Sequence, residues 1–161
     1  MGQTKQFGAS QRSAIYAPAI AFACLVVAAG FFGGLFRPDA WYAALNKAPW
    51  NPPNWVFAPV WTILYIMIGI AGWLVWRGNA RDRQIVLWLA ALVLNALWTP
   101  LFFGAKLAGL ALAEMLFLLA AIIGFIFAAR PVDRRAAWLF VPYALWVTYA
   151  TSLTAWVWWN N

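Results

Sequence analysis

Residues 41–61 read Trp-Tyr-Ala-Ala-Leu-Asn-Lys-Ala-Pro-Trp-Asn-Pro-Pro-Asn-Trp-Val-Phe-Ala-Pro-Val-Trp, with four of the chain's thirteen tryptophans and four of its nine prolines. Proline fixes its own φ and restricts the residue before it, so the stretch favours an extended or turned shape over a helix. It joins two long apolar segments. We therefore expect the chain between those segments to form a stiff, aromatic-rich lid over a membrane helix bundle. The alternative is a simple interfacial belt of aromatic side chains.

The composition is that of an integral membrane protein. Hydrophobic residues make up 66% of the 161 residues and charged residues 9%, against roughly 25% charged in soluble domains. The length allows a single domain. The formal net charge of +7 comes from scattered Lys and Arg, a pattern that suits lipid headgroups and argues against nucleic acid. There is no histidine, and Cys24 is the only cysteine. We expect no metal site, no histidine-ligated haem and no intrachain disulfide.

Five apolar segments follow a polar N-terminal tail at residues 1–13. They lie near residues 14–36, 54–76, 84–104, 107–129 and 136–158. Each is long enough to span the ~30 Å hydrocarbon core as a helix at ~1.5 Å per residue. Runs this continuous exclude the alternating strands of a membrane barrel. The sequence predicts an all-α bundle of five transmembrane helices in one domain, residues 14–161, with the Pro/Trp-rich lid as an external loop between the first two helices.

Lys and Arg predict the orientation of the bundle, because cytoplasmic loops carry an excess of both. One side has Lys5, Arg12, Arg77, Arg81, Arg83, Arg130, Arg134 and Arg135. The other side has Arg37, Lys47 and Lys106. We therefore expect a multi-pass protein of the bacterial cell membrane, with its N-terminus in the cytoplasm and its lid and C-terminus outside.

Aromatic and polar side chains inside the apolar segments indicate a cavity. Asn95, Trp98 and Phe102 share one face of the third segment. Asn95 either orients a flat ligand or hydrogen-bonds to a neighbouring helix, and the spacing leaves both open. Similar faces on the second and fifth segments are formed by Trp61 and Tyr65, and by Trp146, Ala150 and Leu153. Each face alone is typical of helix–helix packing. Together with the lid, the three faces indicate an apolar small-molecule site.

Glu114 is the only acid well inside an apolar segment. Lys106 lies about 12 Å away by helix rise, too far for a direct salt bridge. Glu114 is therefore uncharged, snorkels or pairs with another helix, and a proton relay is its alternative role. No nucleophile–base pair or phosphate loop is visible. We expect hydroxyl bonds to the local helix backbone from Thr62, Thr99, Thr148 and Thr151.

Four stretches form a recognisable set. The first is Trp-Tyr-x-x-Leu with Lys-x-Pro-Trp-Asn-Pro-Pro-x-Trp-Val-Phe-x-Pro-Val-Trp-Thr-x-Leu-Tyr, within residues 41–65. The others are Leu-Asn-Ala-Leu-Trp-Thr-Pro-Leu-Phe-Phe-Gly at 94–104, Pro-Tyr-x-x-Trp at 142–146 and Ala-Thr-x-Leu at 150–153. In order and spacing they resemble the TspO/MBR family, the bacterial tryptophan-rich sensory proteins related to the mitochondrial translocator protein or peripheral benzodiazepine receptor. The likeness covers about residues 14–161.

The resemblance implies a five-helix membrane protein that binds porphyrins, sterols such as cholesterol, and benzodiazepine-type ligands. It places the pocket beneath the first external loop, and homodimers are common in the family. The family's pocket positions fall on Trp41, Tyr42, Trp50, Trp55, Phe57, Trp61, Asn95, Trp98, Phe102, Trp146, Ala150 and Leu153. With Tyr65 from the helical spacing, these are the expected ligand-binding residues.

Some positions depart from the family pattern. Pro49 replaces a tryptophan that has been linked to porphyrin handling in bacterial relatives, and Thr154 stands where asparagine is usual. Ala155 and Trp159 occupy the places of the Tyr and Arg of the mammalian-like sterol motif. Sterol recognition through that motif is therefore not expected.

We interpret the chain as a membrane receptor or sensor for tetrapyrroles (protoporphyrin IX and haem-type porphyrins) and other flat apolar ligands, regulating porphyrin- or stress-linked responses. Porphyrin is the ligand, and no cofactor is required. The lid would open for a ligand that binds between the first, second, third and fifth helices, where Arg37 and Lys47 meet its propionates. The first alternative is an enzyme that degrades protoporphyrin with light or oxygen through Trp41 and Trp61. The second is a porphyrin or sterol transporter.

Overall fold

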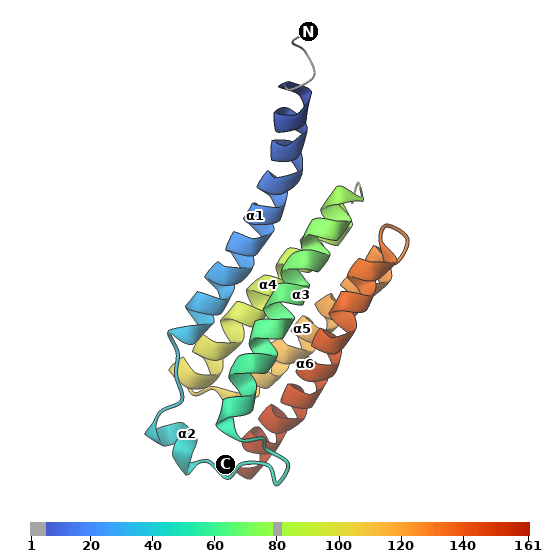
Figure 1. The fold of residues 1–161 in the computed structure, drawn as a ribbon. Helices are drawn as coiled ribbons and strands as arrows, with labels where there is room; N and C mark the ends of the chain where they lie inside the picture. Colours follow the sequence, from blue (N-terminus) through green and yellow to red (C-terminus); the bar gives the residue numbers. More distant parts are fainter. Residues whose placement is uncertain (1–5, 79–81) are drawn as a thin grey trace.

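The computed structural model describes residues 6–78 and 82–161, which form a bundle of long helices (Figure 1). The long helices are α1 Gln6–Gly34, α3 Phe57–Arg77, α4 Asp82–Thr99, α5 Ala108–Ala129 and α6 Arg134–Asn160. Within these ranges there are five helices long and apolar enough to cross a membrane, and no strand. The predicted all-α membrane bundle is confirmed. Of the basic residues used for the orientation, Lys5, Arg81 and the side chain of Arg12 lie outside the described part.

The N-terminal boundary of the first helix differs from the prediction. The sequence predicts a polar tail up to residue 13, whereas α1 begins at Gln6. The stretch able to span a membrane begins at Tyr16. A helix satisfies its own backbone hydrogen bonds on either side of the bilayer surface. Hydrophobicity therefore predicts where a span begins, and not where its helix begins.

The lid is also less extended than the sequence predicts. It contains a short helix, α2 Ala40–Ala44, and a 3₁₀ turn, η1 Asn54–Val56. Residues 39–48 contain no proline that would prevent a helix. The carboxylate of Asp39 caps α2 by accepting a hydrogen bond from the Tyr42 N–H at 3.2 Å, which satisfies a backbone donor at the helix start. The prediction of an extended or turned shape is therefore wrong for residues 41–44.

The five long helices form a closed ring in the order α1, α3, α6, α5, α4, and each contacts the helices before and after it. α4 and α5 are adjacent and antiparallel, as their short connection predicts. The end of α3, the start of α4 and the α5–α6 connection lie at one end of the ring, and the lid and the C-terminus lie at the other (Figure 1). The lid therefore covers one mouth of the ring.

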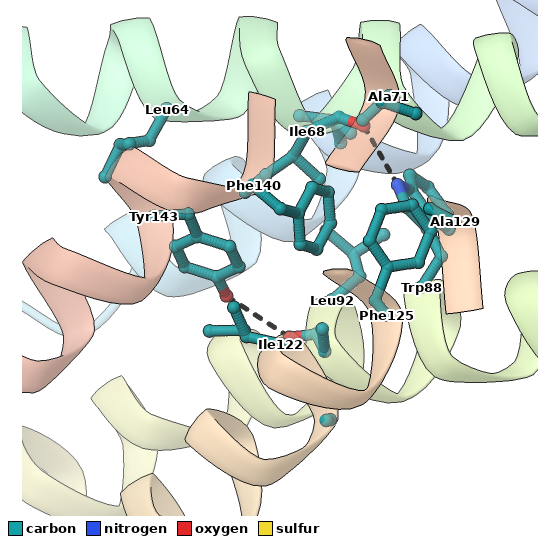
Figure 2. Close-up of a cluster of buried hydrophobic side chains, with 14 of the residues drawn as sticks. Leu64, Ile68, Ala71, Trp88, Leu92, Ile122, Phe125, Ala129, Phe140 and Tyr143 are labelled. Carbon is teal, nitrogen blue, oxygen red and sulfur yellow. Dashed lines mark hydrogen bonds between the residues drawn. The ribbon is translucent and has the colours of Figure 1, made fainter. Parts of the chain in front are cut away.

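The half of the bundle away from the lid is closely packed. Trp88, Phe125, Phe140 and Tyr143 are fully buried there (Figure 2). The indole Nε1 of Trp88 donates to the Ile68 carbonyl at 2.9 Å. The rings of Phe125 and Phe140 lie 4.0 Å apart between centroids. This half forms the hydrophobic core that holds the helices in place.

Glycines allow helices to approach closely at two points. A Cβ atom on Gly72 of α3 would lie 2.6 Å from Phe22 and 2.7 Å from Trp88. A Cβ on Gly30 of α1 would lie 3.1 Å from the ring of Tyr65. Both approaches are contacts within one chain, so they position α1 and α3 in the bundle.

A π-helical turn, η2 Pro100–Gly104, ends α4. Pro100 has no N–H to continue the α-helical ladder, and the N–H of Ala105 donates to the Pro100 carbonyl over the wider step, at 2.8 Å. Lys106 then adopts a positive φ of 59° where the chain turns toward α5. Such turns often occur at functional sites. Here the wide turn carries Phe102 and Phe103, whose rings contact the lid.

Candidate functional site

A cavity of about 570 Å³ occupies the lid half of the bundle. All five long helices contribute to its wall, together with η2 and the lid. Aromatic and aliphatic side chains dominate the lining, and a few polar groups interrupt it. A concave, mostly apolar space with few polar groups is the usual form of a small-molecule site.

The structure brings most of the predicted ligand-binding residues together. Those that line the cavity are Tyr42, Phe57, Trp61, Tyr65, Asn95, Trp98, Phe102, Trp146, Ala150 and Leu153. Three others lie outside the lining. Trp41 packs behind Phe102 with its ring centroid 5.7 Å away, and Trp50 and Trp55 are 48% and 74% exposed. Of the two indoles considered for redox chemistry, the cavity therefore contains Trp61 and not Trp41.

Flat aromatic faces form much of the wall. The rings of Trp98 and Phe102 stack at 5.0 Å with an interplanar angle of 13°. Their separation along α4 and η2 places them one above the other. The ring centroids of Trp61 and Tyr65 lie 5.5 Å apart, and the angle between the ring planes is 33°. A planar ligand can bind against such faces through dispersion and offset stacking.

Asn95 hydrogen-bonds across the bundle and also lines the cavity. The hydroxyl of Tyr65 on α3 donates to Asn95 Oδ1 on α4 at 2.8 Å. The alternative of a bond to a neighbouring helix is therefore observed. It does not exclude the ligand-orienting role, because the amide nitrogen takes no part in that bond and can donate to a ligand.

The lid is fastened to α6 at two places. The hydroxyl of Tyr149 donates to the Trp50 carbonyl at 2.7 Å, and Trp50 Nε1 lies 3.3 Å from Ser152 Oγ. At the end of α6, the side-chain amide of Asn161 accepts from the Asn46 N–H at 2.9 Å and donates to the Asn46 carbonyl at 3.3 Å. These bonds close the lid over the cavity.

An ion pair fastens the other end of the lid. Lys106 Nζ lies 2.9 Å from a carboxylate oxygen of Asp39. The hydrogen bond from Lys106, together with the Tyr42 N–H, holds the pKa of Asp39 below its ordinary range. Both side chains are largely exposed, so the pair is screened by solvent and serves to position the lid more than to stabilise it.

The two basic residues assigned to the propionates occupy different places. Arg37 lines the cavity and is exposed at its mouth. Lys47 lies outside the lining. Its ammonium donates to the Ala43 carbonyl at 3.3 Å and lies 4.6 Å from the centre of the Tyr42 ring. Of these two residues, Arg37 alone lines the cavity.

The cavity also contains residues that sequence reasoning missed. The lid adds Asn51 and Asn54, and α5 adds Met115 and Leu118, although the sequence places the ligand among the other four helices only. The two asparagines stand inside the proline-rich motif, which is a signal that could have identified them. Met115 and Leu118 gave no such signal, because α5 is apolar on all sides apart from Glu114.

Glu114 precedes the cavity residue Met115 on α5. It is 7% exposed, and neither carboxylate oxygen has a hydrogen-bond partner within the described part of the chain. Of the alternatives that the sequence leaves open, snorkelling and pairing with another helix are wrong, and an uncharged carboxyl remains.

The predicted local hydroxyl bonds are confirmed for Thr62, Thr99, Thr148 and Thr151.

Comparison with known proteins agrees with this architecture. The sequence pattern of the TspO/MBR family matches residues 22–159. A tryptophan-rich sensory protein of Cereibacter sphaeroides is 40% identical over 121 residues, which cover 75% of this chain and 77% of that one. The translocator protein of Ovis aries is 36% identical over 154 residues, 91% of each chain. The tryptophan-rich protein TspO of Chlorobaculum tepidum is 39% identical over 136 residues, 80% of this chain and 86% of that one. This chain therefore belongs to the TspO/MBR family.

Proposed function

We propose that this membrane receptor binds tetrapyrroles such as protoporphyrin IX, and other flat apolar ligands, in the lidded cavity and signals their presence. The observation that carries the proposal is the cavity itself, a space of about 570 Å³ with stacked aromatic faces on its wall. An aromatic-walled space of this size suits a planar, largely apolar molecule.

The polar groups of the cavity suit a ligand that has carboxylates on one edge and a neutral polar atom elsewhere in its ring. Asn95 and Tyr65 lie among the side chains deeper in the bundle, and Arg37 lies at the mouth. A porphyrin has pyrrole nitrogens in a flat ring and carboxylates on one edge. Arg37 would meet the carboxylates, as guanidinium groups pair well with them, while Asn95 donates to a polar atom of the ring.

The test is a titration of tryptophan fluorescence with protoporphyrin IX in the dark, followed by illumination and analysis of the recovered porphyrin. We expect saturable quenching and intact porphyrin. Trp61→Phe should reduce the affinity, whereas Trp138→Phe, at an exposed position outside the cavity, serves as the matched control. Absence of saturable quenching would refute the proposal.

The same experiment separates the receptor from the enzyme. An enzyme would convert the porphyrin to a new product on illumination, and that product would be lost in Trp61→Phe and retained in Trp138→Phe. Flux of porphyrin into sealed vesicles would identify the transporter. Intact porphyrin without flux supports the receptor.

We also propose that the lid faces outward. The C-terminal ends of α3 and α5 and the N-terminal ends of α4 and α6 lie opposite the lid (Figure 1). The basic residues at or next to these ends are Arg77, Arg83, Arg130, Arg134 and Arg135. This bias favours the cytoplasm for that end. A C-terminal tag should be cleaved by protease added to intact cells, and an N-terminal tag should be protected. The reverse pattern would mean that the orientation is inverted.

A further inference from the structure

A second hollow, of about 460 Å³, lies between α1 and α3 on the outside of the bundle. Its lining is almost entirely apolar. Val27 of α1 and Ile66 of α3 belong to this lining and are 69% and 58% exposed. Both lie within the stretches that span the membrane. We refer to this hollow as the α1–α3 groove, and it opens toward lipid.

The α1–α3 groove and the cavity share two residues among those described. Gly30 and Tyr65 line both. The ring of Tyr65 lies against the backbone of α1, because Gly30 has no Cβ and a Cβ there would be 3.1 Å from the ring. One aromatic side chain therefore separates the cavity from the hydrocarbon side.

Among the residues that the structure describes, a single hydrogen bond fastens the Tyr65 side chain. Its hydroxyl donates to Asn95 Oδ1 at 2.8 Å, and its ring rests against Trp61. The lid, by contrast, has bonds from Tyr149 and Asn161 and the Asp39–Lys106 ion pair. Displacing Tyr65 breaks fewer hydrogen bonds and ion pairs than opening the lid.

We infer that the ligand reaches the cavity from the bilayer, through the α1–α3 groove, and that Tyr65 is the side chain that moves aside. This inference rests on the proposed function, and it replaces the expectation that the lid opens for the ligand. A flat apolar molecule concentrates in the hydrocarbon region, so a lateral opening meets it where it is most abundant. The lid can then stay closed while the ligand passes.

The test measures association and dissociation rates of protoporphyrin IX by stopped-flow fluorescence in lipid nanodiscs. Tyr65→Phe removes the hydroxyl that fastens the ring. Both rates should rise about fivefold, the factor that corresponds to one neutral hydrogen bond of average strength. Val27→Phe fills the α1–α3 groove without altering the cavity wall, and both rates should fall together while the affinity stays nearly constant. Leu25→Phe, on the lipid face of α1 outside the groove, is the matched control and should match the wild type.

A locked lid distinguishes the two routes. Asn46→Cys with Asn161→Cys, in a Cys24→Ser background, allows a disulfide where the lid meets the end of α6. Association that is unchanged by oxidation supports the lateral route. Association that stops on oxidation and recovers on reduction would overturn the inference and leave the binding function intact. Absence of saturable binding in every variant would overturn both.

Discussion

The hydrogen bond from Tyr149 to the lid gives a quantitative prediction. Tyr149→Phe removes the hydroxyl that donates to the Trp50 carbonyl at 2.7 Å and keeps the ring that packs near Trp146. A neutral hydrogen bond contributes about 0.5–1.5 kcal/mol, and this bond is solvent-exposed. A loss of about 0.5–1 kcal/mol corresponds to lid opening that is about two- to fivefold more frequent.

Hydrogen exchange followed by mass spectrometry measures this opening directly. Peptides from the lid should exchange about two- to fivefold faster in Tyr149→Phe, since exchange reports the free energy of local opening. Peptides from α5 should be unchanged. Asn161→Ala removes two bonds to the Asn46 backbone, so its effect on the lid should be larger than that of Tyr149→Phe.

The control is Thr148→Val, one residue away. Its hydroxyl donates to the Ala144 carbonyl of its own helix at 2.8 Å, and not to the lid. Thr148→Val should leave lid exchange as in the wild type. The reasoning fails if Tyr149→Phe does not alter lid exchange, or if exchange rises equally in α5, because the second result would show a loss of global stability.

Three further predictions follow from the site and the core. Asn95→Ala should weaken porphyrin binding about five- to tenfold by removing one hydrogen bond, and an unchanged affinity by titration would place the pocket elsewhere. Gly72→Ala should destabilise the bundle by about 1–3 kcal/mol because its methyl group overlaps Trp88, which thermal unfolding in detergent would show. The pKa of Asp39 is lowered by Lys106, so the ion pair is present above the ordinary carboxyl pKa and is lost as pH falls through the lower folded value. The exchange rate of the lid, corrected for intrinsic rates, should therefore stay constant between pH 5 and 8, because the ion pair is present throughout. Asp39→Asn removes the ion pair and should raise the exchange rate of the lid across that range.

The spanning helices could be predicted because the bilayer imposes their length and their apolar composition. The lid was less predictable. Its prolines exclude a long helix, but α2 depends on the cap that Asp39 provides, and a five-residue helix leaves little periodicity to detect. The π-helical turn after Thr99 follows from Pro100, although a proline alone does not specify whether a helix kinks, ends or widens.

The site could be predicted in part for a related reason. Asn95 and Trp98 stood out because a polar or aromatic group inside a span is unusual, and both line the cavity. Leu118 is one apolar residue among many on α5, so its position in the wall could not be read from the sequence. The bond between Tyr65 and Asn95 depends on how α3 and α4 are rotated about their axes, which spacing within a single helix does not determine.

The packing of the bundle explains how one small chain can be both stable and hollow. Near the α3–α4 connection, Gly72 faces Phe22 and Trp88 so closely that no side chain would fit. Near the lid, Gly34 has no atom from another helix within 4 Å of where its Cβ would be, and it lines the cavity. Gly72 thus lets helices approach in the packed half, and Gly34 leaves space at the cavity wall, although Gly30 on the same helix lets Tyr65 approach α1. Because the packed half fixes the helices, the hollow half keeps its shape without being filled, and a ligand that enters it gains the dispersion contacts that the empty wall lacks.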